Sequence, residues 1–349
     1  MIVCALGGTS IAGTGIQFIP FAGNENATAR GMSRDGSTYV GSGALNNGTS
    51  GAILWREPGE GTLLADGWNS LATDASNNGS VIVGQNRGQP FVYSVTDGLI
   101  EVPDILGFPV NKHVRVSANG TTVVGGSLNG AFRWTRESGT EILDPPGTWD
   151  EARATAISAD GSIVAGFGET DGLSSRQAWT WTESGGFDVI GRPGDTITEM
   201  TPNGHVVVGR GPNGAFRYSI GTGKRVELDG FDSIPVIEDV TGISADGSIL
   251  VGSAADPLQA DPTLGFIVAT IWFGEDPSPV RFQEYLNDLG VNTDGWFLQG
   301  LSAISDDGQT ILGWGVNDAL EGRPFVVILP APASALVLAV LPLAAHRRR

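Results

Sequence analysis

Short apolar stretches separated by turn residues recur along the whole chain. A motif, Ser-x-Asp/Asn-Gly followed by apolar residues and Gly, occurs seven times, with Thr in place of Ser in the fifth copy. Its glycines are Gly36, Gly79, Gly120, Gly161, Gly204, Gly247 and Gly308, which lie 43, 41, 41, 43, 43 and 61 residues apart. Asp-Gly and Asn-Gly between apolar runs are typical of β-hairpins, because these residues tolerate the positive φ of tight turns. The pattern therefore predicts seven hairpins in seven copies of one module.

Each module continues in the same way after its hairpin. A variable loop leads to an aromatic strand, such as Ala-Phe-Arg-Trp at 131–134, and a short fourth strand follows, as at 141–143. Four short antiparallel strands every ~42 residues are typical of a propeller blade, and single blades need neighbours to bury their faces. A two-sheet sandwich would not explain seven copies of a four-strand unit. We therefore predict an all-β fold, a seven-bladed β-propeller.

The two ends of the repeat region complement each other. The seventh copy has a hairpin at 305–313 and an aromatic strand at 323–329, but no fourth strand. Upstream of the first copy lies an unassigned strand of fourth-strand type at 16–21. Placing this strand in the last blade removes an exposed sheet edge. We expect residues 16–329 to form one propeller that is closed by its N-terminal strand.

The sixth interval is longer than the others and contains an insertion at 279–289. Pro279 is well placed to open a helix, and Phe282, Tyr285, Leu286 and Leu289 fall at helical spacing. The insertion is predicted to be a short helix packed on the rim. The other interpretation is a docking element for a partner.

These modules resemble the HAF repeat, an extracellular repeat class named for its His-Ala-Phe strand. The resemblance rests on Ala131-Phe132-Arg133-Trp134 and on the Ser-Ala-Asp-Gly-Ser hairpins that begin at Ser158 and Ser244. Gly130 and Gly214 stand where the family has histidine, so no role of that histidine is carried over. The resemblance spans residues 16–329 and implies an exported β-propeller.

Composition excludes several classes of function. The formal net charge is −18, and no cluster of Lys or Arg precedes residue 347, which argues against a partner made of nucleic acid. Glycine makes up 52 of 349 residues, in keeping with many tight turns. The single cysteine, Cys4, forms no internal disulfide, and with three histidines the chain lacks a Cys/His zinc site.

The C-terminus carries the strongest targeting signal. An uncharged stretch at 325–345 precedes His346, Arg347, Arg348 and Arg349, and Pro330 and Pro332 lie within it. This Pro-x-Pro, apolar run and arginine cluster resembles the PEP-CTERM sorting signal, with Ala331 where that family usually has Glu. The resemblance implies export and transfer to an exosortase-type enzyme that cleaves near the Pro-x-Pro motif. The alternative is a plain membrane anchor, since the apolar run is just long enough to cross a bilayer.

The domain limits follow from these signals. Residues 1–15 are apolar and are interpreted as the remnant of a signal peptide, residues 16–329 as the propeller, and residues 330–349 as the sorting signal and transmembrane segment. We expect the protein in the cell envelope, at the cell surface or in the extracellular space, with the membrane contacted only by the C-terminal segment before processing.

The sequence shows no specific catalytic set. A Ser-His-Asp triad would have to use His113 or His205, which are predicted to be solvated surface residues. The acidic turns lack the spacing of a calcium loop, and hairpin geometry accounts for them. We therefore predict no metal, no cofactor and no catalytic residues. The function expected is a non-catalytic scaffold or binding module, and a secreted carbohydrate-active hydrolase or lyase that uses two acidic residues is the alternative.

A ligand would bind on the loops opposite the hairpins. The variable loops there carry Phe21, Trp68, Phe108, Trp149, Phe231 and Trp296, and three of these aromatics have a carboxylate nearby, namely Asp66, Asp150 or Asp294. Aromatic faces beside carboxylates suit sugar rings, which favours Trp68, Trp149 and Trp296 as a polysaccharide-binding face. The alternative is that these aromatics fill gaps between blades.

Overall fold

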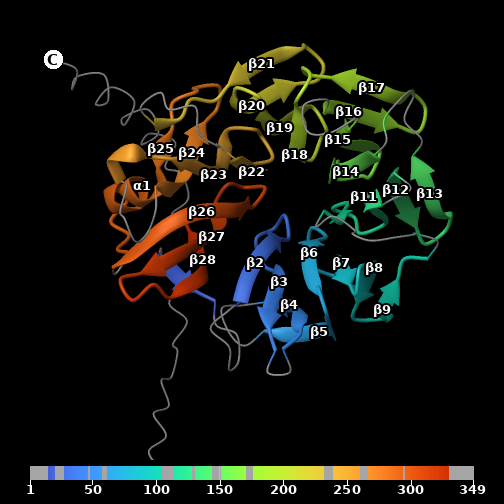
Figure 1. Ribbon diagram of the computed structural model, residues 1–349, viewed down its shortest axis with the longest axis horizontal. Helices are drawn as coiled ribbons and strands as arrows, with labels where there is room; N and C mark the ends of the chain where they lie inside the picture. Colours follow the sequence, from blue (N-terminus) through green and yellow to red (C-terminus); the bar gives the residue numbers. More distant parts are fainter. Residues whose placement is uncertain are drawn as a thin grey trace, which may run out of the picture.

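The computed structural model describes residues 15–19, 27–45, 48–56, 61–103, 105, 113–127, 130–143, 149, 151–169, 176–231, 239–259, 266–293 and 295–329. Within these residues the fold is nearly all β, built from curled antiparallel sheets. Five sheets have four strands, and one eight-stranded sheet joins two further groups of four through the pair Gly126 and Arg153. We call each group of four a unit and number the units along the chain (Figure 1).

Units 1 to 6 use their strands in sequence order, from an inner first strand to an outer fourth strand, and unit 7 takes its outer strand from the N-terminal part of the chain. The first strands are β2 (Ala27–Met32), β6 (Leu71–Ala75), β10 (Arg115–Val116), β14 (Glu151–Ile157), β18 (Thr196–Met200), β22 (Asp239–Ile243) and β26 (Trp296–Ile304). The second strands are β3 (Tyr39–Ala44), β7 (Val81–Asn86), β11 (Thr122–Ser127), β15 (Ile163–Glu169), β19 (Val206–Gly211), β23 (Ile249–Ala255) and β27 (Thr310–Asn317).

The outer half of each unit contains the aromatic strand and a short edge strand. The third strands are β4 (Ser50–Trp55), β8 (Gln89–Ser94), β12 (Gly130–Thr135), β16 (Gln177–Thr182), β20 (Gly214–Ser219), β24 (Ile267–Phe273) and β28 (Gly322–Ile328). The fourth strands are β5 (Thr62–Gly67), β9 (Gly98–Glu101), β13 (Gly139–Leu143), β17 (Gly186–Ile190), β21 (Lys224–Glu227), β25 (Val280–Arg281) and β1 (Gly15–Phe18). A 3₁₀ turn spans Pro257–Gln259.

The N-terminal strand completes the last unit, as the sequence predicts. β1 pairs antiparallel with β28, with Gly15 opposite Ile328 and Phe18 opposite Phe325. The strand ends at Phe18, short of the predicted residue 21, and residues 20–26 lie outside the described part of the chain. The predicted helix is also present as α1 (Phe282–Asp288), whose Phe282 and Leu286 are buried.

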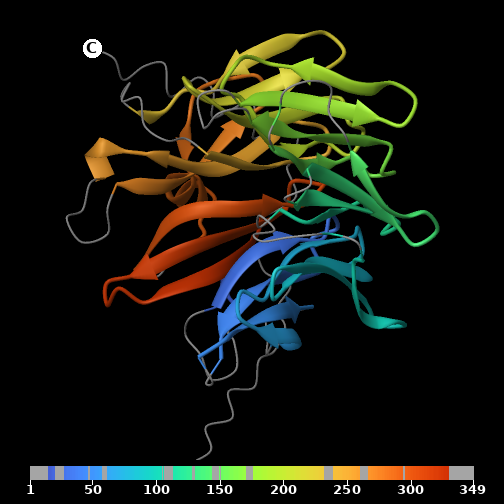
Figure 2. The ribbon, with the colours of Figure 1, turned by 45° about the vertical axis from the view of Figure 1, so that its right-hand side comes forward.

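Among the described residues, seven hydrophobic clusters hold the units together, and each lies between two of them. The third-strand aromatic of one unit faces the preceding unit, as Phe132 and Trp134 of unit 3 do against Val83 and Val92 of unit 2. The cluster that contains Ile53 and Trp55 of unit 1 also contains Leu312 and Val326 of unit 7. Figures 1 and 2 accordingly show the last, red strands lying beside the first, blue ones.

The hairpin motif forms one repeated hydrogen-bond pattern. In unit 4, Ser158 Oγ donates to Asp160 Oδ1 at 2.7 Å, and the Ser162 amide and hydroxyl donate to the same oxygen at 3.0 and 2.8 Å. These hydrogen bonds lower the pKa of Asp160 below its usual value, and burial opposes them. The Ile163 amide then donates to Ser158 Oγ at 2.9 Å. The acidic or amide residue of the motif is therefore used within its own turn.

Backbone hydrogen bonds link most of these hairpins from one unit to the next. The donor and acceptor pairs are Asp35 N and Asn77 O, Asn77 N and Ala118 O, Asn119 N and Ala159 O, Ala159 N and Pro202 O, Ala245 N and Asp306 O, and Asp306 N and Arg34 O, at 2.7–3.3 Å. Pro202 accepts such a bond but donates none, because proline has no amide hydrogen.

The second-strand glycine of the motif is required by close approach of the first strand. Most first strands contain a β-bulge, which brings their backbone against the second strand. A Cβ at Gly252 would lie 1.8 Å from the carbonyl oxygen of Asp239, and one at Gly166 would lie 1.9 Å from that of Arg153. A threonine lies at the bulge in four of these strands, and its hydroxyl donates a hydrogen bond to a backbone carbonyl oxygen of the next unit. The pairs are Thr73 and Val114, Thr155 and Ile197, Thr198 and Val240, and Thr241 and Leu301, at 2.5–2.6 Å.

The hairpin glycine packs against the preceding unit, which yields a direct test. Gly161 has φ +79°, and a Cβ there would lie 2.7 Å from Thr122 Oγ1, whereas Gly186 has φ +68° with no atom within 4 Å. Both Gly→Ala variants should lose about 1–2 kcal/mol from the positive φ. Gly161→Ala should lose about 1–3 kcal/mol more, because it also forces the two units apart. Urea unfolding of both variants measures the difference, and equal losses would contradict the contact.

Candidate functional site

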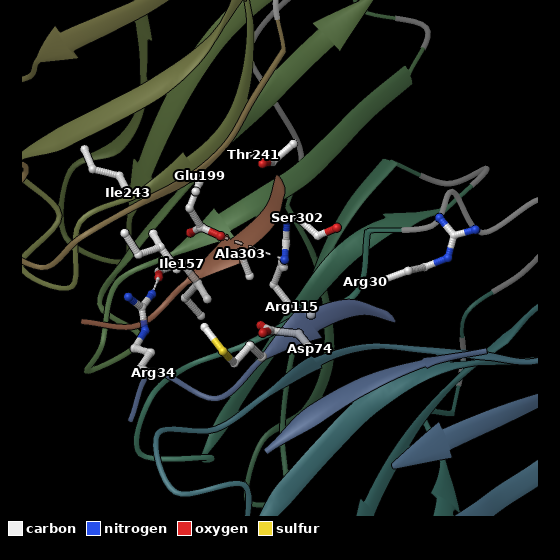
Figure 3. Close-up of a pocket in the computed structure, with 14 residues that line it drawn as sticks. Arg30, Arg34, Asp74, Arg115, Ile157, Glu199, Thr241, Ile243, Ser302 and Ala303 are labelled. Carbon is white, nitrogen blue, oxygen red and sulfur yellow. Dashed lines mark hydrogen bonds and ion pairs between the residues drawn. The ribbon is translucent and has the colours of Figure 1, made fainter. Parts of the chain in front are cut away.

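The first strands of all seven units line one small internal cavity. Two residues before the motif Ser or Thr, units 2, 3 and 5 place Asp74, Arg115 and Glu199, while the other units have Gly or Ala there. Asp74, Arg115 and Glu199 face the cavity together with Arg34 of unit 1, whereas the Arg30 side chain points away from them (Figure 3). The fold therefore brings four charged side chains together from four different units.

Arg115 is held by groups from two other units. Its Nη1 lies 3.8 Å from Glu199 Oε2, its Nε donates to the Thr155 carbonyl oxygen at 3.0 Å, and its Nη2 donates to that of Thr198 at 3.5 Å. The bulges in β14 and β18 fall at Thr155 and Thr198 and turn these carbonyl groups toward the cavity. The guanidinium therefore bridges units 3, 4 and 5.

Asp74 is bonded mainly by backbone amides. Its Oδ1 accepts from the Ala75 amide at 2.9 Å, and its Oδ2 accepts from the Val116 amide of unit 3 at 2.9 Å. Burial raises the pKa of Asp74 to about 6; Arg115 lowers it, the Glu199 carboxylate raises it and the Val116 amide lowers it. Burial outweighs the nearby arginine, so Asp74 titrates well above an ordinary aspartate.

Arg34 and Arg30 lie at opposite ends of the drawn group (Figure 3). Arg34 Nη2 donates to the Ile157 carbonyl oxygen of unit 4 at 3.3 Å, and its Nη1 lies 3.4 Å from Asp306 Oδ1 of unit 7. Arg34 thus spans the cavity at the hairpin end. The Arg30 side chain is exposed to solvent.

The cavity measures about 50 Å³. A water molecule needs roughly 10–15 Å³ of such volume, so the space holds a few waters and is too small for a sugar ring. Asp74, Arg115, Glu199 and Arg34 are bonded to one another or to backbone groups of other units. These noncovalent contacts connect the first strands of different units to one another.

The predicted aromatic residues lie at the starts of first strands but differ in exposure. Trp68 follows β5 and is 55% exposed. Trp149 and Trp296 are half-buried, since Trp149 meets Phe187 at 6.4 Å between ring centroids and Trp296 stacks on Phe18 at 4.0 Å. These two side chains therefore fill space within units 4 and 7 while keeping part of their surface open.

Of the other residues predicted for that face, some are described and some lie outside the described part of the chain. Asp66 is exposed beside Trp68, and Phe231 is buried under the Arg281 guanidinium. Phe21, Phe108, Asp150 and Asp294 lie outside the described part of the chain, as do Pro330, Pro332, Arg347, Arg348 and Arg349.

His113 and His205, the two histidines of the repeat region, are exposed. No group of three or more His, Cys, Asp or Glu side chains within the described ranges is placed to hold a metal ion.

The sequence pattern alone did not single out Asp74, Arg115 and Glu199. The signal was present, because aligning the seven motifs on their Ser or Thr places one residue of each copy at the same inner position. At that position three copies have a charged residue where the other four have Gly or Ala, and this contrast points to the cavity.

No family model matches this sequence. A search of curated proteins found no significant relative either.

The raised pKa of Asp74 predicts a pH-dependent stability. The unfolded chain releases this proton near pH 3.8 and the folded chain near pH 6, so the contribution of Asp74 to folding falls as pH rises between these values. The unfolding free energy of the wild type relative to Asp74→Asn should drop by up to about 3 kcal/mol from pH 3.5 to pH 7.

Urea unfolding at a series of pH values measures this difference. Asp66→Asn, at an exposed position, controls for the loss of one negative charge. A wild-type advantage over Asp74→Asn that stays constant or rises with pH contradicts the prediction.

Proposed function

We propose that the seven units form a closed seven-bladed β-propeller. Three contacts between unit 7 and unit 1 support this: the cluster of Trp55 with Leu312 and Val326, the Asp306 amide bonded to the Arg34 carbonyl, and the approach of Gly36 to Thr310. The pairing of β1 with β28 supplies the fourth strand of the last blade.

We further propose that the protein is an exported, non-catalytic scaffold or binding module of the cell envelope or extracellular matrix. The observation that carries the proposal is the state of the central charges. Asp74, Arg115, Glu199 and Arg34 are engaged with partners from other units around a cavity of about 50 Å³. This supports a structural role for these charged side chains. A ligand would then bind on the outer surface of the protein and not in the central cavity.

Export is supported by the sequence of the C-terminal tail. Its resemblance to the PEP-CTERM signal favours an exosortase-type enzyme as a transient partner, with processing near Pro330 and Pro332. In the part of the chain that the structure describes, no helix is long and apolar enough to cross a membrane.

Polysaccharide is the ligand class that we propose. Trp68 offers an open aromatic surface beside Asp66, and Trp149 and Trp296 keep part of their rings accessible at equivalent places in other units. Apolar stacking combined with hydrogen bonding to carboxylates suits sugar rings.

The processing proposal predicts a shorter mature protein. Mass spectrometry of the native protein should detect peptides of the repeat region but none from residues 336–349, because that segment is removed after export. Recovery of the intact tail from soluble cytosol would contradict the proposal.

The binding proposal predicts that glycan retention depends on the aromatic face. Purified protein should bind at least one polysaccharide on affinity gels, and Trp68→Ala should weaken that binding at least threefold with an unchanged melting temperature, because Trp68 is already exposed. Val95→Ala is the matched control, since Val95 is 75% exposed on a turn at the hairpin end. Release of reducing sugars or unsaturated products from any polysaccharide would favour the enzyme alternative.

A further inference from the structure

A larger groove lies at the hairpin end, between units 3 and 4. It is lined by Arg133 of β12, by Ser162 of the unit 4 hairpin, and by Trp181, Glu183 and Ser184 at the end of β16. Its volume is about 580 Å³, which is in the range of sites for small ligands. It lies opposite the loops that carry Trp68, Trp149 and Trp296.

At the equivalent position between units 5 and 6, ion pairs cross the junction. Arg217 follows Ala-Phe in β20 as Arg133 does in β12, and it lies 3.5 Å from Glu275 of unit 6. Lys224 also pairs with Glu275, at 2.6 Å. Two cations and one carboxylate therefore bridge those units at the position of the groove.

The junction of units 3 and 4 lacks this bridge. The strand register places Gly139 of unit 3 where unit 5 has Lys224, so no lysine reaches across. Glu183, on the turn that corresponds to that of Glu275, forms no ion pair among the described residues. The substitution of glycine for lysine thus leaves both the groove and the Glu183 carboxylate open.

The open groove combines donors, acceptors and an aromatic side chain. Arg133 Nη1 lies 3.7 Å from Glu141 Oε2, and its Nε is buried without a hydrogen-bond partner. The guanidinium lies 6.0 Å from the centre of the Trp181 ring. The Glu183 carboxylate can accept hydrogen bonds, and the Ser184 hydroxyl can both donate and accept them.

The charges of this lining select the class of ligand. One cation and one free carboxylate face the groove, so a ligand of either charge meets a group that repels it. A neutral ring with hydroxyl groups can instead bond to both, while its apolar edge contacts Trp181. We propose that this groove binds a pyranose ring of a neutral polysaccharide. The inference rests on the proposed binding function and places a glycan site on the face opposite the predicted one.

Isothermal titration of the purified repeat protein with neutral hexasaccharides tests the proposal. The probes are α-1,4-glucan, β-1,3-glucan and β-1,4-glucan hexasaccharides, with an oligogalacturonate as the acidic comparison. At least one neutral probe should bind, and Glu183→Ala and Arg133→Gln should each weaken that binding tenfold or more. Glu183 is exposed, so its variant should keep the wild-type melting temperature.

Glu137→Ala is the matched control, because it removes the same charge from an exposed position on the neighbouring turn, outside the groove. It should change affinity by less than twofold. Binding that survives Glu183→Ala and Arg133→Gln, or that is lost only in Trp68→Ala, overturns the groove proposal and leaves the proposed function standing. Binding of the oligogalacturonate alone also overturns it. Failure of every glycan to bind overturns both.

Discussion

Each four-stranded unit has two apolar faces, and only a neighbouring unit on either side removes both from water. The hydrophobic clusters show how this is met, since each one takes residues from two units. Burial of this kind is the dominant favourable term in folding. It explains why the third strand carries large aromatics in most copies. The hairpin hydrogen bonds and the threonines at the bulges add polar links between neighbouring units.

Much of this architecture could be predicted from local sequence. The Asp/Asn-Gly turns have a stereochemical cause that any single copy reveals, and the pairing of 16–21 with the last unit followed from one missing and one unassigned strand. The helix at Phe282–Asp288 followed from apolar spacing. Those features depend on residues close together in the chain or on the count of repeats.

The bulges and the cavity charges could not be predicted in the same way. The bulge at Thr198 depends on how β18 meets β19, and its hydroxyl bonds to Val240 of the next unit. Asp74, Arg115 and Glu199 each look like an ordinary surface residue within a single copy. Their shared environment arises only when the inner strands of different units converge. The same holds for Glu183, whose open state depends on Gly139 in another unit.

The pairing of β1 with β28 sets the order in which this protein can fold. β1 is synthesised before the other described strands, and its partner strand Gly322–Ile328 is synthesised after all of them. Until then β1 has no strand to pair with. Such a long-range contact carries a large closure entropy and forms late. Chains interrupted before residue 322 would therefore present unpaired strand edges to one another, so aggregation of incomplete chains is the specific hazard that this strand arrangement creates.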